Sequence, residues 1–203
     1  MATAKQIEHF TMDLCEKIKN ERVTFSKPGS IKHLLFGSEP SEQSLYIKMG
    51  KVGEEMIKQI IRQNPKLELL TCGPQCIDQP TGKNKDLDLV WKDDINKMIY
   101  YREAKGNLEL DSEKLPATID KINEIISKKI SPDYPDYNID IGVFNWSIYN
   151  RTPLKKGLSH IKKCEEKGIK VEHPEDLFKL LELDWSEEDY YAFFRKLGKL
   201  FRE

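Results

Sequence analysis

Apolar residues recur every three or four positions in several stretches of the chain, which is the spacing of one buried face on an α-helix. The first stretch carries Ile7, Phe10, Leu14 and Ile18. Prolines mark the limits of two of the later predicted helices, because proline ends a helix or occupies its first turn. The helices predicted from these patterns span residues 4–19, 41–63, about 116–130, 158–167, 174–183 and 187–201.

Other stretches alternate apolar and polar residues or are short and β-branched, which is typical of strands. Residues 86–91 alternate, and residues 98–105 are the next predicted strand after a polar turn at 93–96, so the two segments predict an antiparallel hairpin. Pairing about that turn places position 88 near position 103. Further strands are predicted at residues 67–71, 139–146 and 169–171. Strands mixed with helices predict an α/β domain, with a central mixed sheet flanked by helices.

Composition narrows the class of protein. The chain has 203 residues, of which 38% are hydrophobic, with 33 Lys+Arg against 34 Asp+Glu. No stretch reaches the roughly 18 apolar residues of a membrane span, and the spread of aromatic residues argues against disorder. The length indicates a single domain, 1–203. The near-zero net charge gives no electrostatic indication of a nucleic-acid partner.

The first residues lack the apolar core of a signal peptide, so the sequence predicts a cytoplasmic protein with reduced thiols. Cys72 and Cys76 form a C-x₃-C pair around Gly73-Pro74. No second pair lies at the spacing of a zinc site, so we interpret the two cysteines as small side chains flanking a turn.

Two carboxylates and a lysine are predicted at one end of the hairpin. Glu103 and Lys105 lie two residues apart on one strand and share a face, and Asp88 lies on the neighbouring strand. Adjacent carboxylates need a counter-charge, and Mg²⁺ favours such oxygen ligands. Lys105 would then stand beside the ion. The alternative is a non-catalytic interaction domain in which these residues form the solvated face of a strand.

The arrangement Asp88…Glu103-Ala104-Lys105 resembles the PD-(D/E)xK motif of many type II restriction endonucleases and related DNA nucleases. The upstream segment from Gly50 to Ile57 resembles the G-x-x-x-E helix of some branches of that family, with Glu54 at the glutamate. The resemblance covers about residues 45–150, the expected catalytic core. Helix 4–19 precedes this core, and a basic and helical region, 151–203, follows it. Leu87 replaces the proline of the motif, so Asp86 remains an alternative to Asp88. In the upstream helix, Glu55 is the alternative to Glu54.

The resemblance implies a restriction-endonuclease-like core and Mg²⁺-dependent, site-specific cleavage of double-stranded DNA as part of a restriction–modification defence. Glu54, Asp88 and Glu103 would hold one or two Mg²⁺ ions, and Lys105 would orient or deprotonate the nucleophile. A homodimer is expected, with a DNA methyltransferase as a genetic rather than physical partner. The alternative within the same fold is a structure-specific or repair nuclease, such as a Holliday-junction resolvase.

Basic residues are concentrated after the predicted core. Residues 151–170 contain seven Lys or Arg against two Glu, so a near-neutral total does not exclude DNA. The candidate DNA contacts are Asn107, Asn150, Arg151, Lys155, Lys156, Lys162 and Lys163. The aromatic residues of 185–201 are predicted to pack on the core or to form a dimer interface.

Overall fold

The computed structural model describes residues 2–20, 34, 42–78, 80–106, 108, 114–146 and 155–200. Its helices are α1 (Ala4–Asn20), α3 (Glu42–Gln63), α4 (Leu115–Ile125), the π-helical segment η2 (Ile126–Ile130), α5 (Ser131–Asp133), α6 (Lys155–Glu165), α7 (Pro174–Leu180) and α8 (Glu187–Leu200). Its strands are β1 (Glu68–Leu69), β2 (Gly73–Asp78), β3 (Lys83–Leu87), β4 (Leu89–Asp93), β5 (Met98–Lys105), β6 (Asn138–Asn145) and β7 (Lys170–Glu172). Every predicted helix is confirmed within a few residues.

Five strands form a mixed sheet in the order β1-β4-β5-β6-β7. The pairs β1–β4 and β4–β5 are antiparallel, whereas β5–β6 and β6–β7 are parallel. In the β4–β5 hairpin Leu89 pairs with Arg102, which is the register that the turn at 93–96 predicted. The prediction of a mixed α/β fold with a central sheet flanked by helices is therefore confirmed.

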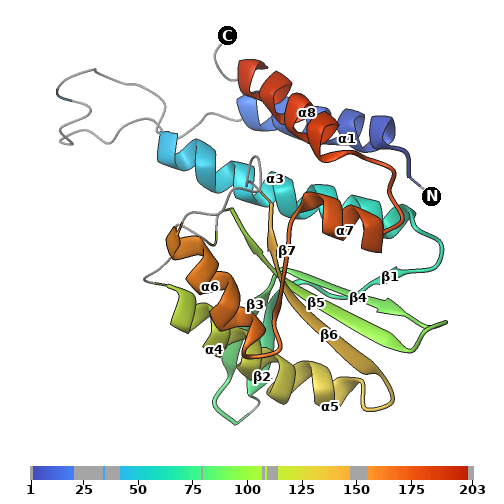
Figure 1. Cartoon of the computed structure of the whole chain (residues 1–203), viewed down its shortest axis with the longest axis vertical. Helices are drawn as coiled ribbons and strands as arrows, with labels where there is room; N and C mark the ends of the chain where they lie inside the picture. The colour runs from blue at the N-terminus through green and yellow to red at the C-terminus, as the bar shows by residue number, and fades with distance from the viewer. Residues whose placement is uncertain are drawn as a thin grey trace.

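Helices cover both faces of the sheet (Figure 1). Helices α3 and α7 lie on one face, and α4, η2, α5 and α6 lie on the other. Helices α1 and α8 lie side by side on the outer side of α3, so this half of the molecule has an additional helical layer. Within the described ranges, no helix is both long and apolar enough to cross a membrane.

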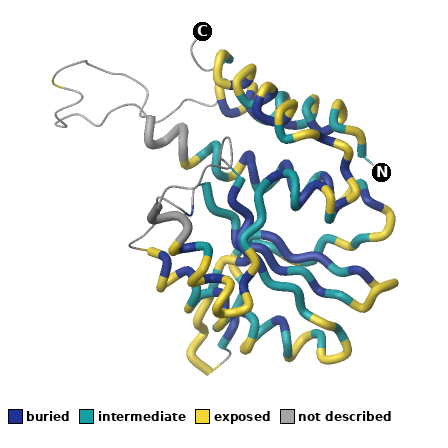
Figure 2. The backbone as a smooth tube through the Cα atoms, viewed as in Figure 1, coloured by how far each residue is buried: buried dark blue, intermediate teal, exposed yellow. Residues whose placement is uncertain are grey.

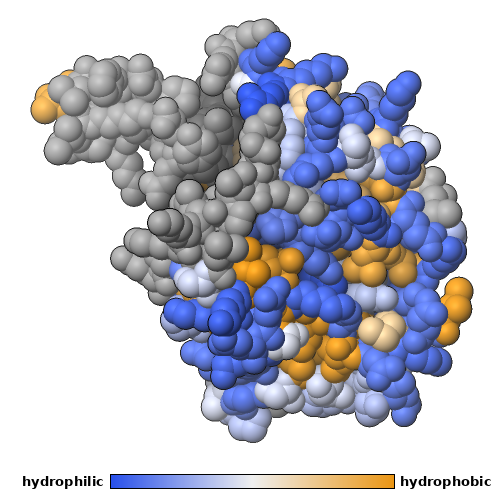
Figure 3. All heavy atoms as spheres, viewed as in Figure 1, coloured by the Kyte–Doolittle hydropathy of each residue, from blue (hydrophilic) through white to orange (hydrophobic). Residues whose placement is uncertain are grey.

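Two buried clusters fill the spaces between these layers (Figure 2). The larger one joins Trp91 and Phe144 of the sheet to α1, α3, α7 and α8, and it includes Tyr190, Phe193 and Leu197. The C-terminal aromatic residues therefore pack on the core, as one of the two sequence interpretations predicted. On the face drawn in Figure 3, hydrophobic residues occur as separate patches within a mainly hydrophilic surface.

The region before β4 differs from the sequence prediction. Strands β2 and β3 form a separate two-stranded sheet, where the sequence had predicted a turn between Cys72 and Cys76. The predicted strand 86–91 is also interrupted, because the chain passes from the small sheet to the central sheet at Asp88. There the Asp88 side chain accepts a hydrogen bond from the Ala104 N–H, at 2.9 Å. All four cysteines are free thiols.

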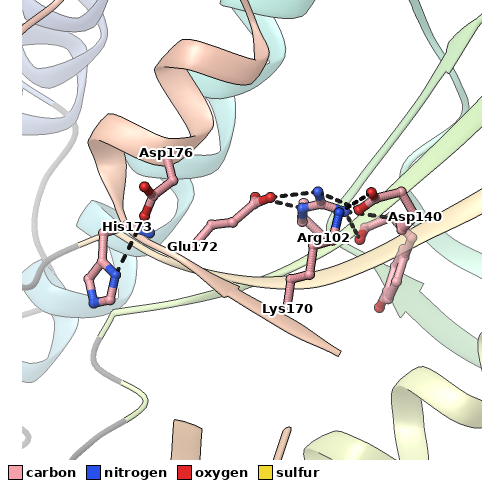
Figure 4. Close-up of polar contacts among 7 residues, drawn as sticks. Arg102, Asp140, Lys170, Glu172, His173 and Asp176 are labelled. Atoms are coloured by element: carbon pink, nitrogen blue, oxygen red, sulfur yellow. Dashed lines mark hydrogen bonds and ion pairs between the residues drawn. The ribbon is translucent and has the colours of Figure 1, made fainter. Parts of the chain in front are cut away.

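A fully buried arginine joins β5 to β6 and β7 (Figure 4). The Nε and Nη2 atoms of Arg102 donate to the two carboxylate oxygens of Glu172, each at 2.7 Å. Nη2 also forms an ion pair of 2.7 Å with Asp140. Lys170 also binds Asp140. The arginine is therefore paired with a carboxylate on both sides, and it connects strands that are far apart in the sequence.

Gly142 provides the space for this arginine. An added Cβ at Gly142 would lie 2.8 Å from Cδ and Nε of Arg102, whose side chain is pinned by its ion pairs. We expect Gly142→Ala to lower the free energy of unfolding by about 1–3 kcal/mol, as overpacking does. Gly50→Ala is the control, because nothing lies within 4 Å of its Cβ position in α3. Urea denaturation should show Gly50→Ala to be neutral or stabilising, and equal effects of the two variants would contradict the prediction.

Candidate active site

Asp88, Glu103 and Lys105 lie together where β5 ends. Glu103 and Lys105 share a face of β5, and the Lys105 ammonium lies 3.2 Å from a Glu103 carboxylate oxygen. The Glu103 side chain is only 3% exposed. Asp88 is held across the hairpin by the Ala104 N–H. The hairpin register thus brings two carboxylates to the same end of the sheet.

A lysine from α4 lies between the two carboxylates. The Lys121 Nζ is 2.7 Å from Glu103 Oε2 and 3.4 Å from Asp88 Oδ1. The Tyr101 hydroxyl donates to the same Glu103 oxygen, at 2.8 Å. The ammonium of Lys121 therefore occupies the place where a cation shared by Asp88 and Glu103 would be held.

Burial and like charge perturb the titration of this cluster. Burial and, after it, the nearby Glu103 carboxylate raise the pKa of Asp88 to about 7, against the opposing effect of Lys121. Burial lowers the pKa of Lys121, but its contacts with Glu103 and Asp88 outweigh this and leave it raised. Burial also raises the pKa of Tyr101. Strongly perturbed groups of this kind are concentrated at functional sites.

The raised pKa of Asp88 predicts a pH-dependent cost to stability. A carboxyl group whose pKa rises on folding contributes its full stabilisation at pH values below its ordinary pKa of 3.8. That contribution is lost as the pH rises through the folded-state pKa of about 7. The Asp88→Asn variant does not lose stability in this way, because its amide does not titrate. In metal-free buffer we expect this variant to melt above the wild type at pH 8, with a gap that closes towards pH 4.

Thermal denaturation followed by circular dichroism measures this gap. Asp86→Asn is the control, because the Asp86 side chain on β3 is exposed; its melting temperature should follow that of the wild type. An Asp88→Asn variant that melts below the wild type at pH 8 would show that ionised Asp88 stabilises the fold.

Glu54 lies on α3, outside the carboxylate pair. Burial raises its pKa, and the carboxylates of Asp86 and Glu103 add to this, so it lies within electrostatic reach of the site. Glu55 is directed to Lys58, at 2.9 Å, and to Arg62. Among the residues that the structure describes, no group of three or more His, Cys, Asp or Glu could hold a metal ion. The structure thus does not assemble the predicted three-carboxylate set.

The Asp88–Glu103 pair nevertheless fits a hard divalent cation. Mg²⁺ commonly binds through one or two carboxylates, and water and substrate phosphate complete its coordination. Both side chains supply hard oxygen donors, and both already converge on the Lys121 ammonium. The donor set is therefore suited to Mg²⁺ or Mn²⁺ rather than to a thiolate-bound metal.

Leu108, three residues after the end of β5, is held by two buried side chains. The Asn145 Oδ1 accepts a hydrogen bond from the Leu108 N–H, at 2.9 Å, and the His160 Nδ1 lies 3.1 Å from the Leu108 carbonyl oxygen. Both side chains are buried. They tie β6 and α6 to the end of β5, next to Glu103 and Lys105.

Only part of the predicted DNA-binding set can be placed. Lys162 and Lys163 are exposed on α6, the helix that carries His160. Lys155 and Lys156 belong to the first turn of α6, but their side chains lie outside the described part. Asn107, Asn150 and Arg151 lie outside the described residues altogether.

Sequence reasoning missed Lys121 and Tyr101. A signal for Lys121 existed, because it lies three residues after Thr118 and four before Ile125, both of which α4 buries. It therefore borders the apolar stripe that packs towards the hairpin. That pattern alone does not distinguish Lys121 from the other lysines between residues 114 and 129.

Comparisons with known proteins correct the family assignment. No family model matches the chain, and no curated protein matches it. The fold is similar to a solved structure of Can2 from Sulfobacillus thermosulfidooxidans in complex with cyclic tetra-adenylate, with 16% identity and a TM-score of 0.42. The match covers 88% of this chain but 49% of the other, so this chain spans about half the length of that structure. The assignment to the type II restriction endonucleases was wrong: the match described above is to Can2, and no family model of that class matches the chain.

Proposed function

We propose that this chain is a divalent-metal-dependent nuclease that hydrolyses phosphodiester bonds of DNA at the Asp88–Glu103 pair. The observation that supports this most strongly is the convergence of both carboxylates on the single ammonium of Lys121, at the end of a central strand. Sequence-specific cleavage and a restriction–modification role are not part of the proposal. The homodimer stays a prediction.

The residues divide the work as follows. When bound, a divalent ion lowers the pKa of a coordinated water and neutralises charge on the phosphate. Asp88 and Glu103 would hold that ion, and the Ala104 N–H and the Tyr101 hydroxyl keep the two carboxylates in place. Lys105, with a side chain 23% exposed, can reach a substrate while it stays 3.2 Å from Glu103. It orients the attacking water or stabilises the charge that develops on the phosphate.

Basic side chains on α6 suit the phosphate backbone of DNA. Lys162 and Lys163 are exposed on this helix, whose buried His160 is linked to the segment that leaves β5. Lysines bind phosphates without reading sequence, and the binding weakens as salt rises. A chain with a net charge of −1 should therefore bind DNA weakly and with a strong dependence on salt.

Lys105→Met tests the catalytic assignment. We expect it to slow the nicking of supercoiled plasmid in Mg²⁺ by about 10²–10³-fold, the usual effect of removing one group that stabilises a transition state. DNA binding, measured by gel shift in Ca²⁺, should change by no more than about twofold, because one phosphate contact contributes little. Lys179→Met on α7 is the matched control, since its side chain is 72% exposed and pairs with Glu175.

The same assay decides the proposed function. Nicking that requires Mg²⁺ or Mn²⁺ and stops with EDTA would support it. A folded wild-type protein that nicks no DNA with any divalent metal would overturn it. A Lys105→Met variant as active as Lys179→Met would remove Lys105 from the mechanism.

A further inference from the structure

Lys121 contacts both carboxylates of the pair, whereas the ion pair of Lys105 is with Glu103. The Lys121 ammonium lies 2.7 Å from Glu103 and 3.4 Å from Asp88. Its side chain is only 19% exposed, and α4 is anchored beside it by the buried Thr118 and Ile122. These contacts and this burial hold the Lys121 ammonium at the carboxylate pair in the metal-free structure.

This ammonium and a divalent ion need the same space. An ion held by both carboxylates has to lie between them, at about 2.0–2.1 Å from each ligand oxygen for Mg²⁺. Lys121 Nζ already lies between the same two carboxylates, within 3.4 Å of an oxygen of each. Two positive charges a few ångströms apart in a partly buried site repel each other strongly, so both cannot bind the pair in their best positions.

We propose that Lys121 is a positioning residue that competes with the divalent ion for Asp88 and Glu103. It holds the two carboxylates together in the metal-free protein, and metal binding displaces it. The inference rests on the proposed function, because it takes the pair to be a metal site. It predicts that the wild-type protein binds divalent ions weakly and that removal of the Lys121 charge strengthens binding.

Titration with Mn²⁺ alone tests this, with free Mn²⁺ measured by electron paramagnetic resonance at pH 8 and without DNA. Lys121→Met should bind Mn²⁺ at least about tenfold more tightly than the wild type, because a nearby positive charge is removed. Lys121→Gln should also bind Mn²⁺ more tightly than the wild type. Its amide can still donate hydrogen bonds to the carboxylates, so it replaces the methionine variant if that variant folds poorly. Lys121→Arg keeps the charge and should bind no more tightly than the wild type.

Lys128→Met is the matched control, because Lys128 lies on the adjoining η2 segment but pairs with Glu124 and Asp78. It should bind Mn²⁺ like the wild type. Equal or weaker binding by both uncharged Lys121 variants, with a wild type that binds Mn²⁺ and nicks DNA, would overturn the inference alone. Mn²⁺ binding by none of the proteins would overturn it together with the proposed metal-dependent function.

Discussion

Glu103→Gln should reduce the rate of plasmid nicking by at least about 10³-fold while the protein stays folded. The amide keeps the shape of the side chain and can still accept the Tyr101 hydrogen bond, but it removes one negative ligand from the Asp88–Glu103 pair. Loss of the metal's contribution, several kcal/mol of transition-state stabilisation, corresponds to three or more powers of ten in rate. Initial nicking rates at saturating Mg²⁺, with circular dichroism to check folding, measure the effect.

Glu124→Gln is the control for this prediction. Glu124 lies on α4 only three residues from Lys121, yet its carboxylate binds Lys83, at 2.7 Å, and Lys128 instead of the pair. Its nicking rate should stay within about twofold of the wild type, since surface ion pairs contribute little. If Glu103→Gln nicked as fast as Glu124→Gln, Glu103 would not be a metal ligand.

Arg102→Met should cause the largest loss of stability, about 3–5 kcal/mol in the free energy of unfolding. The arginine side chain is 0% exposed, and its removal would leave the carboxylates of Glu172 and Asp140 without their main partner. A buried charge without a partner costs far more than the net contribution of the pair. Urea denaturation at neutral pH measures this loss.

Arg62→Met is the matched substitution for comparison. The Arg62 side chain is 47% exposed and lies 3.5 Å from Glu55, so its loss should cost less than about 1 kcal/mol. A cost for Arg102→Met no greater than that for Arg62→Met would mean that water or a rearrangement compensates Glu172 and Asp140.

Local patterns predicted most of the fold. The apolar periods of α1, α3 and α8 follow from the geometry of single helices, so they can be read from neighbouring residues. The short polar turn at 93–96 also set the hairpin register, which put Asp88 beside Glu103 before any tertiary contact was considered.

The remaining features depend on contacts between distant parts of the chain. Arg102 meets Glu172 across 70 residues, and Lys121 reaches Asp88 across 33, so no local pattern connects them. The sheet formed by β2 and β3 was missed because Gly73-Pro74 favours a turn, whereas here it begins a strand with Gly73 at φ 88°. The family assignment failed because a few residues at a strand end specify a local chemistry but not the surrounding fold.

The metal site is tested most directly by crystals grown with Mn²⁺ and measured at the manganese absorption edge. We expect an anomalous peak within bonding distance of a carboxylate oxygen of both Asp88 and Glu103, with the Lys121 ammonium displaced from between them. No peak at saturating Mn²⁺, with Lys121 still in contact with both carboxylates, would contradict the metal site and the nuclease function built on it.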